Sequence, residues 1–118
     1  MMVLVCGSVE WQDWQPIQTA LAMLPPGSIV MHGAARGADR IAGSIARKLG
    51  FEVRAYPALW RRYGRGAGLI RNAEMIALGP ELVLAFQLNQ SRGTQHTIDL
   101  ARKAGIPVLV MPLWKVGT

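Results

Sequence analysis

The chain has 118 residues, of which 51% are hydrophobic and 17% are charged, and it carries a formal net charge of +6 at pH 7. These values fit one domain over residues 1–118 and exclude an intrinsically disordered chain, because so much apolar surface can form a core. No apolar stretch approaches the roughly 18 residues that span a bilayer, and the apolar start MMVLVC is too short for a signal peptide, so we expect a cytoplasmic protein without a membrane partner.

Short apolar runs alternate with segments of helical periodicity in the first half of the chain. Residues 3–6 form a continuous apolar run, which is typical of a buried strand. Residues 14–24 place apolar side chains three and four positions apart before a Pro-Pro-Gly sequence, which predicts a helix and its end. A second strand over 29–31 and a second helix over 41–49, which a glycine ends, repeat this order.

The alternation continues to the end of the chain and predicts an α/β fold. The remaining expected elements are a strand over 51–56, a loop over 57–68, a helix over 70–78, a strand over 82–86, a helix over 94–104 and a strand over 108–111. Each parallel pair of strands needs a helix-length crossover. We therefore expect a mostly parallel five-stranded sheet with helices on both faces.

In such sheets, ligands bind outside the carboxyl ends of the strands, where loops lead into helices. The stretch HGAARGAD, residues 32–39, is one of these loops. Its glycines allow a phosphate to approach the main chain, and the following helix adds a partial positive charge. Asp39 could instead accept hydrogen bonds from backbone N–H groups, and the stretch could be only a tight turn. The candidate ligand-binding residues here are Gly33, Arg36, Gly37, Ala38 and Asp39.

A second glycine-containing turn, SRGT, precedes the last predicted helix. Ser91, Arg92 and Thr94 supply hydroxyl and guanidinium donors beside Gly93, so two turns on neighbouring strands could form one anion-binding rim. The alternative is that Ser91 or Thr94 caps the helix.

The segment GAGLIRNAEM places Arg71 and Asn72 in the opening turns of a helix, with Met75 on the same face as Arg71. The arginine could bind a phosphate or carboxylate, and the asparagine a base edge or a ribose. Trp60 and Tyr63, in the preceding loop, either cover the core or stack on a base.

The remaining reactive side chains indicate structural roles. The lone Cys6 lies inside an apolar run and is interpreted as a core residue. His32 is interpreted as a hydrogen-bonded buried histidine and His96 as a helix-surface residue. One cysteine and two scattered histidines lack zinc-ligand spacing, so we expect no metal, and nothing indicates a cofactor.

Four motifs in order resemble the YspA-type, cpYpsA-related branch of the SLOG superfamily. They are G-S-x-x-W from Gly7, HGAARGAD, GLIRNAEM, and LVLAF followed by RGT. The resemblance implies a Rossmann-like three-layer sandwich that binds a nucleotide or nucleotide-derived ligand, and it adds Gly7 and Ser8 to the candidate site. Val9 stands where that branch usually has an arginine.

The same superfamily contains the Lonely Guy phosphoribohydrolases, whose signatures the chain matches in part. Arg71 and Met75 match the first signature, but Thr97 stands where the catalytic glutamate would be. An oxocarbenium-like transition state needs nearby negative charge, which threonine does not supply. Arg71, Asp39 and Glu74 are therefore the catalytic candidates of an alternative hypothesis, an N-glycosidase acting on nucleoside monophosphates.

A third hypothesis is nucleic-acid binding. It rests on the net charge and on the aromatic and arginine side chains of residues 60–65, although no groove-reading helix is visible. The apolar composition also leaves room for a homodimer through a helix face.

Overall fold

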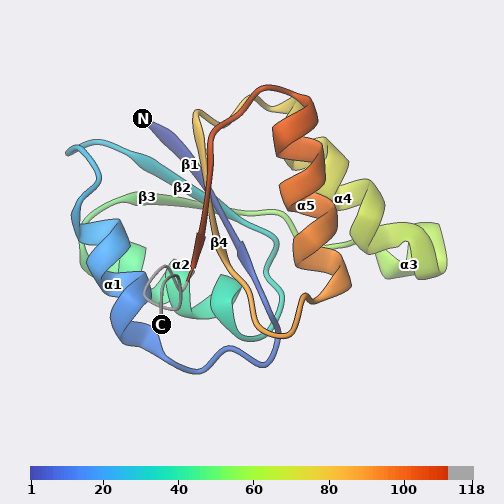
Figure 1. Cartoon of the computed structure of the whole chain (residues 1–118), viewed down its shortest axis with the longest axis horizontal. Helices are drawn as coiled ribbons and strands as arrows, with labels where there is room; N and C mark the ends of the chain where they lie inside the picture. The colour runs from blue at the N-terminus through green and yellow to red at the C-terminus, as the bar shows by residue number, and fades with distance from the viewer. Residues whose placement is uncertain (112–118) are drawn as a thin grey trace.

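The computed structural model describes residues 1–111, which form one five-stranded sheet with helices on both faces (Figure 1). The strand order is β3-β2-β1-β4-β5. The predicted Rossmann-like α/β class is confirmed, and the sheet is parallel throughout rather than mostly parallel. The strands are β1 (Met2–Gly7), β2 (Ile29–His32), β3 (Glu52–Ala55), β4 (Leu82–Phe86) and β5 (Val108–Met111).

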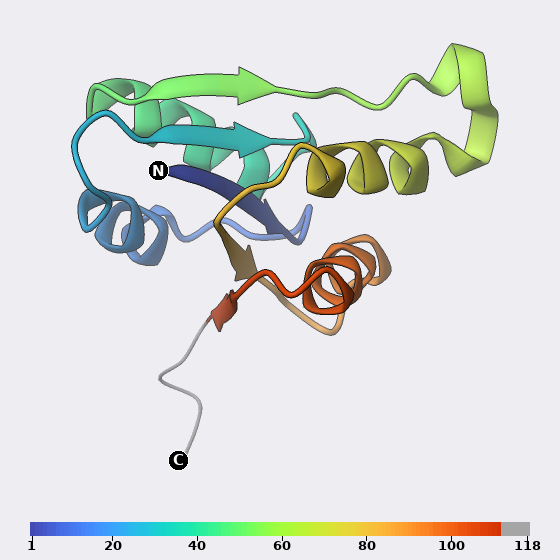
Figure 2. The same cartoon turned by 90° about the horizontal axis from the view of Figure 1, so that it is seen from above.

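Two helices cover each face of the sheet (Figures 1 and 2). One face carries α1 (Trp14–Ala22) and α2 (Ala38–Lys48), and the other carries α4 (Ala67–Ala77) and α5 (Arg92–Lys103). Helix α2 begins at Ala38, three residues before its apolar spacing starts. Helices α4 and α5 begin three and two residues before the predicted positions, because their first turns are rich in glycine and small or polar residues and show no apolar period. Within residues 1–111, no helix has the length and apolar character needed to cross a membrane.

Strand β1 lies at the centre of the sheet and is buried from both sides. Val3 and Val5 pack with α1 and α2, whereas Leu4 and Cys6 pack with α4 and α5. Successive side chains of a strand point to opposite faces, so a strand with a helical layer on each side must be apolar at every position. This requirement explains the continuous apolar run in the sequence.

The predicted loop over residues 57–68 is the main correction to the expected elements. It contains the short helix α3 (Trp60–Tyr63), the 3-10 helix η1 (Gly64–Gly66) and the start of α4. Figure 2 shows α3 beyond the carboxyl ends of the strands. No residue of α3 or η1 is buried, so no core-facing periodicity marks these turns in the sequence.

The chain switches faces at the centre of the sheet. The helix that follows β1 packs on one face, whereas the helix that follows β4 packs on the other, and these two strands are neighbours. Their connections therefore separate and leave a crevice at the carboxyl ends of β1 and β4, which is where open parallel sheets bind ligands.

Gly7 allows three segments to meet beside this crevice. A Cβ added to it would lie 2.5 Å from the carbonyl oxygen of Phe86 and would also overlap the side chain of Ala38. The N–H of Ser8 donates to that Phe86 oxygen at 2.9 Å, and the N–H of Ala38 donates to the Ser8 oxygen at 3.3 Å. Gly37, at φ +78°, places its Cα against the Ser8 carbonyl. The first two loops are thus joined through main-chain atoms.

Replacing Gly7 with alanine should destabilise the fold by about 3 kcal/mol, because a backbone carbonyl cannot move away as a side-chain end can. The free energy of unfolding from chemical denaturation measures this. Gly66→Ala is the control, since Gly66 has φ −80° and open space around its Cα. Equal stability of the two variants would contradict the close packing at Gly7.

Candidate functional site

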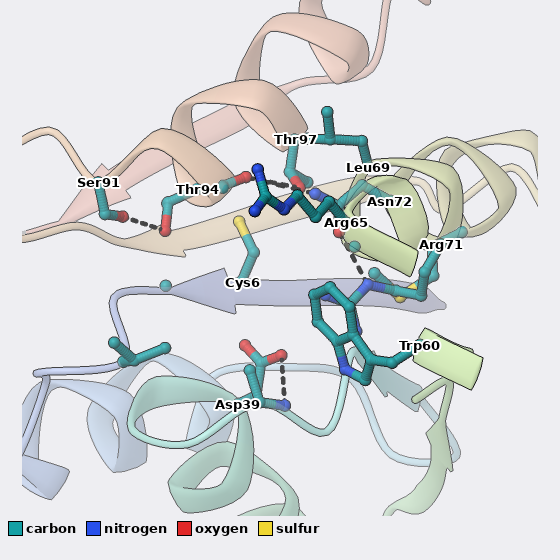
Figure 3. Close-up of a pocket in the computed structure, with 16 residues that line it drawn as sticks. Cys6, Asp39, Trp60, Arg65, Leu69, Arg71, Asn72, Ser91, Thr94 and Thr97 are labelled. Carbon is teal, nitrogen blue, oxygen red and sulfur yellow. Dashed lines mark hydrogen bonds between the residues drawn. The ribbon is translucent and has the colours of Figure 1, made fainter. Parts of the chain in front are cut away.

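A cavity of about 400 Å³ lies at the carboxyl ends of the central strands, between the start of α2 and the first turns of α4 and α5 (Figure 3). Its size is in the range of small-molecule sites. The predicted site residues that line it are Gly7, Asp39, Arg71, Asn72, Ser91, Gly93 and Thr94. The sequence motifs of four separate segments thus contribute to one cavity.

Other predicted site residues do not line this cavity. They are Ser8, Gly33, Arg36, Gly37, Ala38 and Arg92. Arg36 and Arg92 are exposed. Gly33 lies under the guanidinium group of Arg71, where an added Cβ would be 2.5 Å from Nη1. The side chains of these residues therefore contribute to loop packing or to the outer surface rather than to the cavity wall.

Helix α4 presents its side chains to two different hollows. Arg71 and Met75 share the face that lines the cavity, as their spacing predicts. Glu74 is exposed and lines a separate hollow with Tyr56 and Tyr63. Of the two acids proposed as catalytic candidates, only Asp39 therefore borders the cavity.

Asp39 is a buried carboxylate, 5% exposed, in the first turn of α2. Its Oδ2 accepts hydrogen bonds from the N–H of Gly33 at 3.0 Å and of Ala35 at 3.3 Å. Burial raises the pKa of Asp39 to about 6, and the N–H of Ala35, the charge of Arg71 and the N–H of Gly33 act in the opposite direction. The carboxyl group therefore titrates near neutral pH at the edge of the cavity.

Several amides of the HGAARGAD turn donate within the protein, which corrects the expectation that those of Gly33, Ala34 and Ala35 converge on a ligand. Those of Gly33 and Ala35 donate to Asp39, and that of Ala34 donates to His32 Nδ1 at 2.9 Å. The alternative interpretation, in which Asp39 accepts from the backbone, is the one confirmed. The reason is local: Asp39 stands in the first turn of α2, within hydrogen-bond distance of the N–H groups of Gly33 and Ala35.

His32 is buried, as predicted, but only one of its ring nitrogens has a partner. Because Nδ1 accepts from Ala34, Nε2 carries the proton, and this N–H has no hydrogen-bond partner within residues 1–111. Burial, followed by the charges of Arg47 and Arg71, lowers the pKa of His32. The ring packs on Gly43, where an added Cβ would lie 2.6 Å from Nε2.

Arg71 is held by acceptors at the ends of two strands. Its Nη1 donates to the carbonyl oxygens of Gly33 and, at 3.2 Å, Tyr56, and its Nε donates to Asn72 Oδ1 at 2.9 Å. Burial lowers the pKa of Arg71, whereas Asp39 acts to raise it. Arg71 therefore fixes α4 against β2 and β3 while it borders the cavity.

Asn72 joins α4 to α5. Its Nδ2 donates to the carbonyl oxygen of Gly93 at 3.4 Å and lies 3.3 Å from His96 Nδ1. Both ends of the Asn72 amide thus have protein partners, since Oδ1 accepts from Arg71. His96 was expected on the helix surface; it is instead partly buried, and its Nδ1 makes this contact with Asn72.

The N-terminus of α5 has no side-chain cap, although Ser91 stands at the capping position. The Ser91 hydroxyl instead donates to Thr94 Oγ1 at 2.6 Å and accepts from the Ser8 hydroxyl at 3.1 Å. Within residues 1–111, the N–H groups of Arg92, Gly93 and Thr94 have no hydrogen-bond acceptor. This helix start, which borders the cavity, therefore keeps three consecutive main-chain donors available.

Several cavity residues were not in the predicted site. Cys6, interpreted only as a core residue, is buried and also lines the cavity beside Asp39 (Figure 3). Burial, followed by the charge of Asp39, raises the pKa of its thiol, so it stays protonated. Thr97 lines the cavity one turn after Gly93. The signal for Cys6 was its place directly before Gly7, at the end of a central strand.

Three residues of the predicted loop, Trp60, Arg65 and Gly68, also reach the cavity. Trp60 and Arg65 line it together with Leu69, whereas Arg61 and Arg62 do not. Trp60 is 60% exposed, so it does not cover the core. Within residues 1–111, no group of three or more His, Cys, Asp or Glu side chains is placed to hold a metal ion.

Two comparisons with known proteins found related sequences. A model of the "YspA, cpYpsA-related SLOG family" matches residues 1–63, more than half of the chain. The chain is also 43% identical over 116 residues to the Gene 61 protein of Mycobacterium phage D29, and the match covers 91% of this chain and 93% of that protein. The chain belongs to the YspA, cpYpsA-related SLOG family. The resemblance seen in the motifs is confirmed, and membership of the SLOG family indicates a nucleotide-related function.

Asp39→Asn should remove a pH-dependent contribution to the stability of this SLOG protein. The Asp39 carboxyl ionises near pH 3.8 in the unfolded chain and near 6 in the folded one. Its contribution to stability is therefore present below pH 4 and is lost as the pH rises through 6. The free energy of unfolding of Asp39→Asn relative to the wild type should rise by about 2 kcal/mol from pH 4 to pH 7. Because His32 titrates in both proteins, the comparison isolates Asp39, and a constant difference would contradict the raised pKa.

Proposed function

We propose that the cavity binds the phosphate group of a nucleotide or nucleotide-derived ligand at the N-terminus of α5. The observation that carries the proposal is the set of three consecutive N–H groups, of Arg92, Gly93 and Thr94, that have no acceptor within residues 1–111. Helix N-termini with free amides bind anions through these donors and through the helix dipole. A bound phosphate would supply the cap that Ser91 does not.

The hydroxyl groups beside these amides extend the anion site. Ser8, Ser91 and Thr94 form a chain of hydroxyl groups at the end of β1 and the start of α5. Each hydroxyl can rotate to donate or accept, so the chain can reorganise around a ligand without movement of the backbone. Across the cavity, Asp39 keeps its Oδ1 without a hydrogen-bond donor within the described chain, which suits a ribose hydroxyl as donor.

Gly93→Asp tests the phosphate site. A Cβ added at Gly93 meets no protein atom within 4 Å, and an acidic residue in a first helical turn stabilises the helix by about 0.3–1 kcal/mol. The same charge should repel a bound phosphate and weaken binding of AMP and ADP-ribose by at least about tenfold. Calorimetric titration measures the affinity.

Gly93→Asn is the matched control, because asparagine has the size of aspartate without its charge. It should lower the affinity by no more than about threefold, which is a small effect beside the charge repulsion. An aspartate variant that binds AMP as tightly as the wild type would contradict the placement of the phosphate.

A second candidate function is hydrolysis of the N-glycosidic bond of a nucleoside monophosphate. The observation that favours it is that Asp39 borders the cavity on the side opposite Thr97 (Figure 3). In this reaction water adds to the ribose carbon, the carbon–nitrogen bond breaks and the base leaves with a proton. A carboxylate near that carbon stabilises the positive charge that develops on the sugar. Asp39 would therefore replace the catalytic glutamate of the Lonely Guy signature, at whose position this chain has the uncharged Thr97.

Release of free base from the four common nucleoside monophosphates, followed by chromatography, tests this candidate. Asp39→Asn should lower the rate by at least about 100-fold, because it keeps the shape of the side chain and removes its charge. Glu74→Gln should leave the rate unchanged, since Glu74 does not line the cavity. Absence of base release by the wild type, or an unchanged rate in Asp39→Asn, would exclude the candidate.

A further inference from the structure

Trp60 is an aromatic side chain that lines the cavity and is nevertheless 60% exposed. The contrast with Trp11 is informative, because Trp11 is 5% exposed and packs edge-on against Phe86, with ring centroids 5.4 Å apart. Trp11 therefore belongs to the core, whereas most of the Trp60 indole has no protein neighbour.

The position of Trp60 is defined by the short helices that the sequence did not predict. Trp60 begins α3, and the chain turns back through Gly64, at φ +61°, into η1 and α4. The edge of the indole lies on the first turn of α4, where a Cβ added to Gly68 would be 3.5 Å from Cη2 of Trp60. One edge of the ring is thus supported by α4, while most of the residue stays exposed.

The cavity has a polar end and an apolar end. Ser91 and Thr94 lie at one end, and Trp60 lies at the other, beside Arg71 (Figure 3). Leu69, 51% exposed, joins Trp60 in the lining. A ligand that consisted of phosphate and sugar alone would leave these apolar surfaces in contact with water.

We propose that a nucleobase of the ligand stacks on the Trp60 indole while its phosphate caps α5. This inference rests on the proposed function and narrows the ligand class to molecules that carry both a phosphate and an aromatic base, such as nucleoside monophosphates. Bases stack on aromatic side chains through their π faces, and the contribution is large enough to change affinity by a factor of about ten or more. Arg65 also lines the cavity and adds a positive charge to it.

Calorimetric titrations of the wild type, Trp60→Ala and Trp60→Phe with AMP, adenosine and ribose 5-phosphate test the proposal. Trp60→Ala should weaken AMP binding about tenfold or more, and Trp60→Phe should keep the affinity within about threefold, because phenylalanine retains an aromatic face. The affinity for ribose 5-phosphate should not change. Trp14→Ala is the matched control, because Trp14 is 52% exposed on α1 and does not line the cavity.

The outcomes separate this inference from the proposed function. Wild-type affinity for AMP in Trp60→Ala, combined with weaker binding in Gly93→Asp, would overturn the stacking and keep the phosphate site. Adenosine binding as tight as that of AMP and dependent on Trp60 would support the stacking and overturn the phosphate site. A wild-type protein that binds neither ADP-ribose nor any of the four common nucleoside monophosphates would overturn both.

Discussion

The absence of a side chain at Gly7 is the constraint on which the site depends. Because no Cβ separates them, the end of β1, the end of β4 and the start of α2 meet through main-chain atoms. Gly37, with its positive φ, completes this packing on the α2 side. Main-chain contacts of this kind leave little freedom of position, so the start of α2, which carries Asp39, is fixed against the end of β4, from which the chain leads to Ser91.

Two polar networks around the cavity differ in what they leave free. On one side, Asp39, Arg71 and Asn72 satisfy most of their hydrogen-bonding groups within the protein. On the other side, Ser91 and Thr94 pair with each other and leave the first amides of α5 without acceptors. Buried polar groups that are fully paired rigidify a structure, whereas unpaired donors that line a cavity are available to a ligand. The first network therefore holds the walls of the cavity in place, and a bound anion would accept most of its hydrogen bonds from the second.

Much of the fold was predictable because its signals are local. The continuous apolar run of β1 follows from burial on both faces, and the shared cavity face of Arg71 and Met75 follows from helical spacing alone. The position of the cavity at the carboxyl ends of the strands follows from the parallel sheet.

The unpredicted features depend on contacts between distant segments. Whether the Gly33 amide faces a ligand or Asp39 is decided by the angle at which α2 leaves the loop, which no residue pattern encodes. Trp60 reaches the cavity only because α3 and η1 turn back toward α4, and their residues are too exposed to show a period. Cys6 both packs in the core and lines the cavity, and the sequence indicates only its place in the core.

The central position of β1 divides the site between the two halves of the chain. Its pairing with β2 lies within residues 1–63, the part that matches the family model, whereas its pairing with β4 and the Arg71, Gly93 and Thr94 side of the cavity come from later residues. Substitutions of cavity-lining residues after residue 63 can therefore alter which molecule the cavity accepts, while β1, β2 and the Asp39 side of the cavity stay unchanged. A gene that encoded the first half alone would produce a sheet with an open β1 edge, which exposes unpaired backbone groups and favours aggregation.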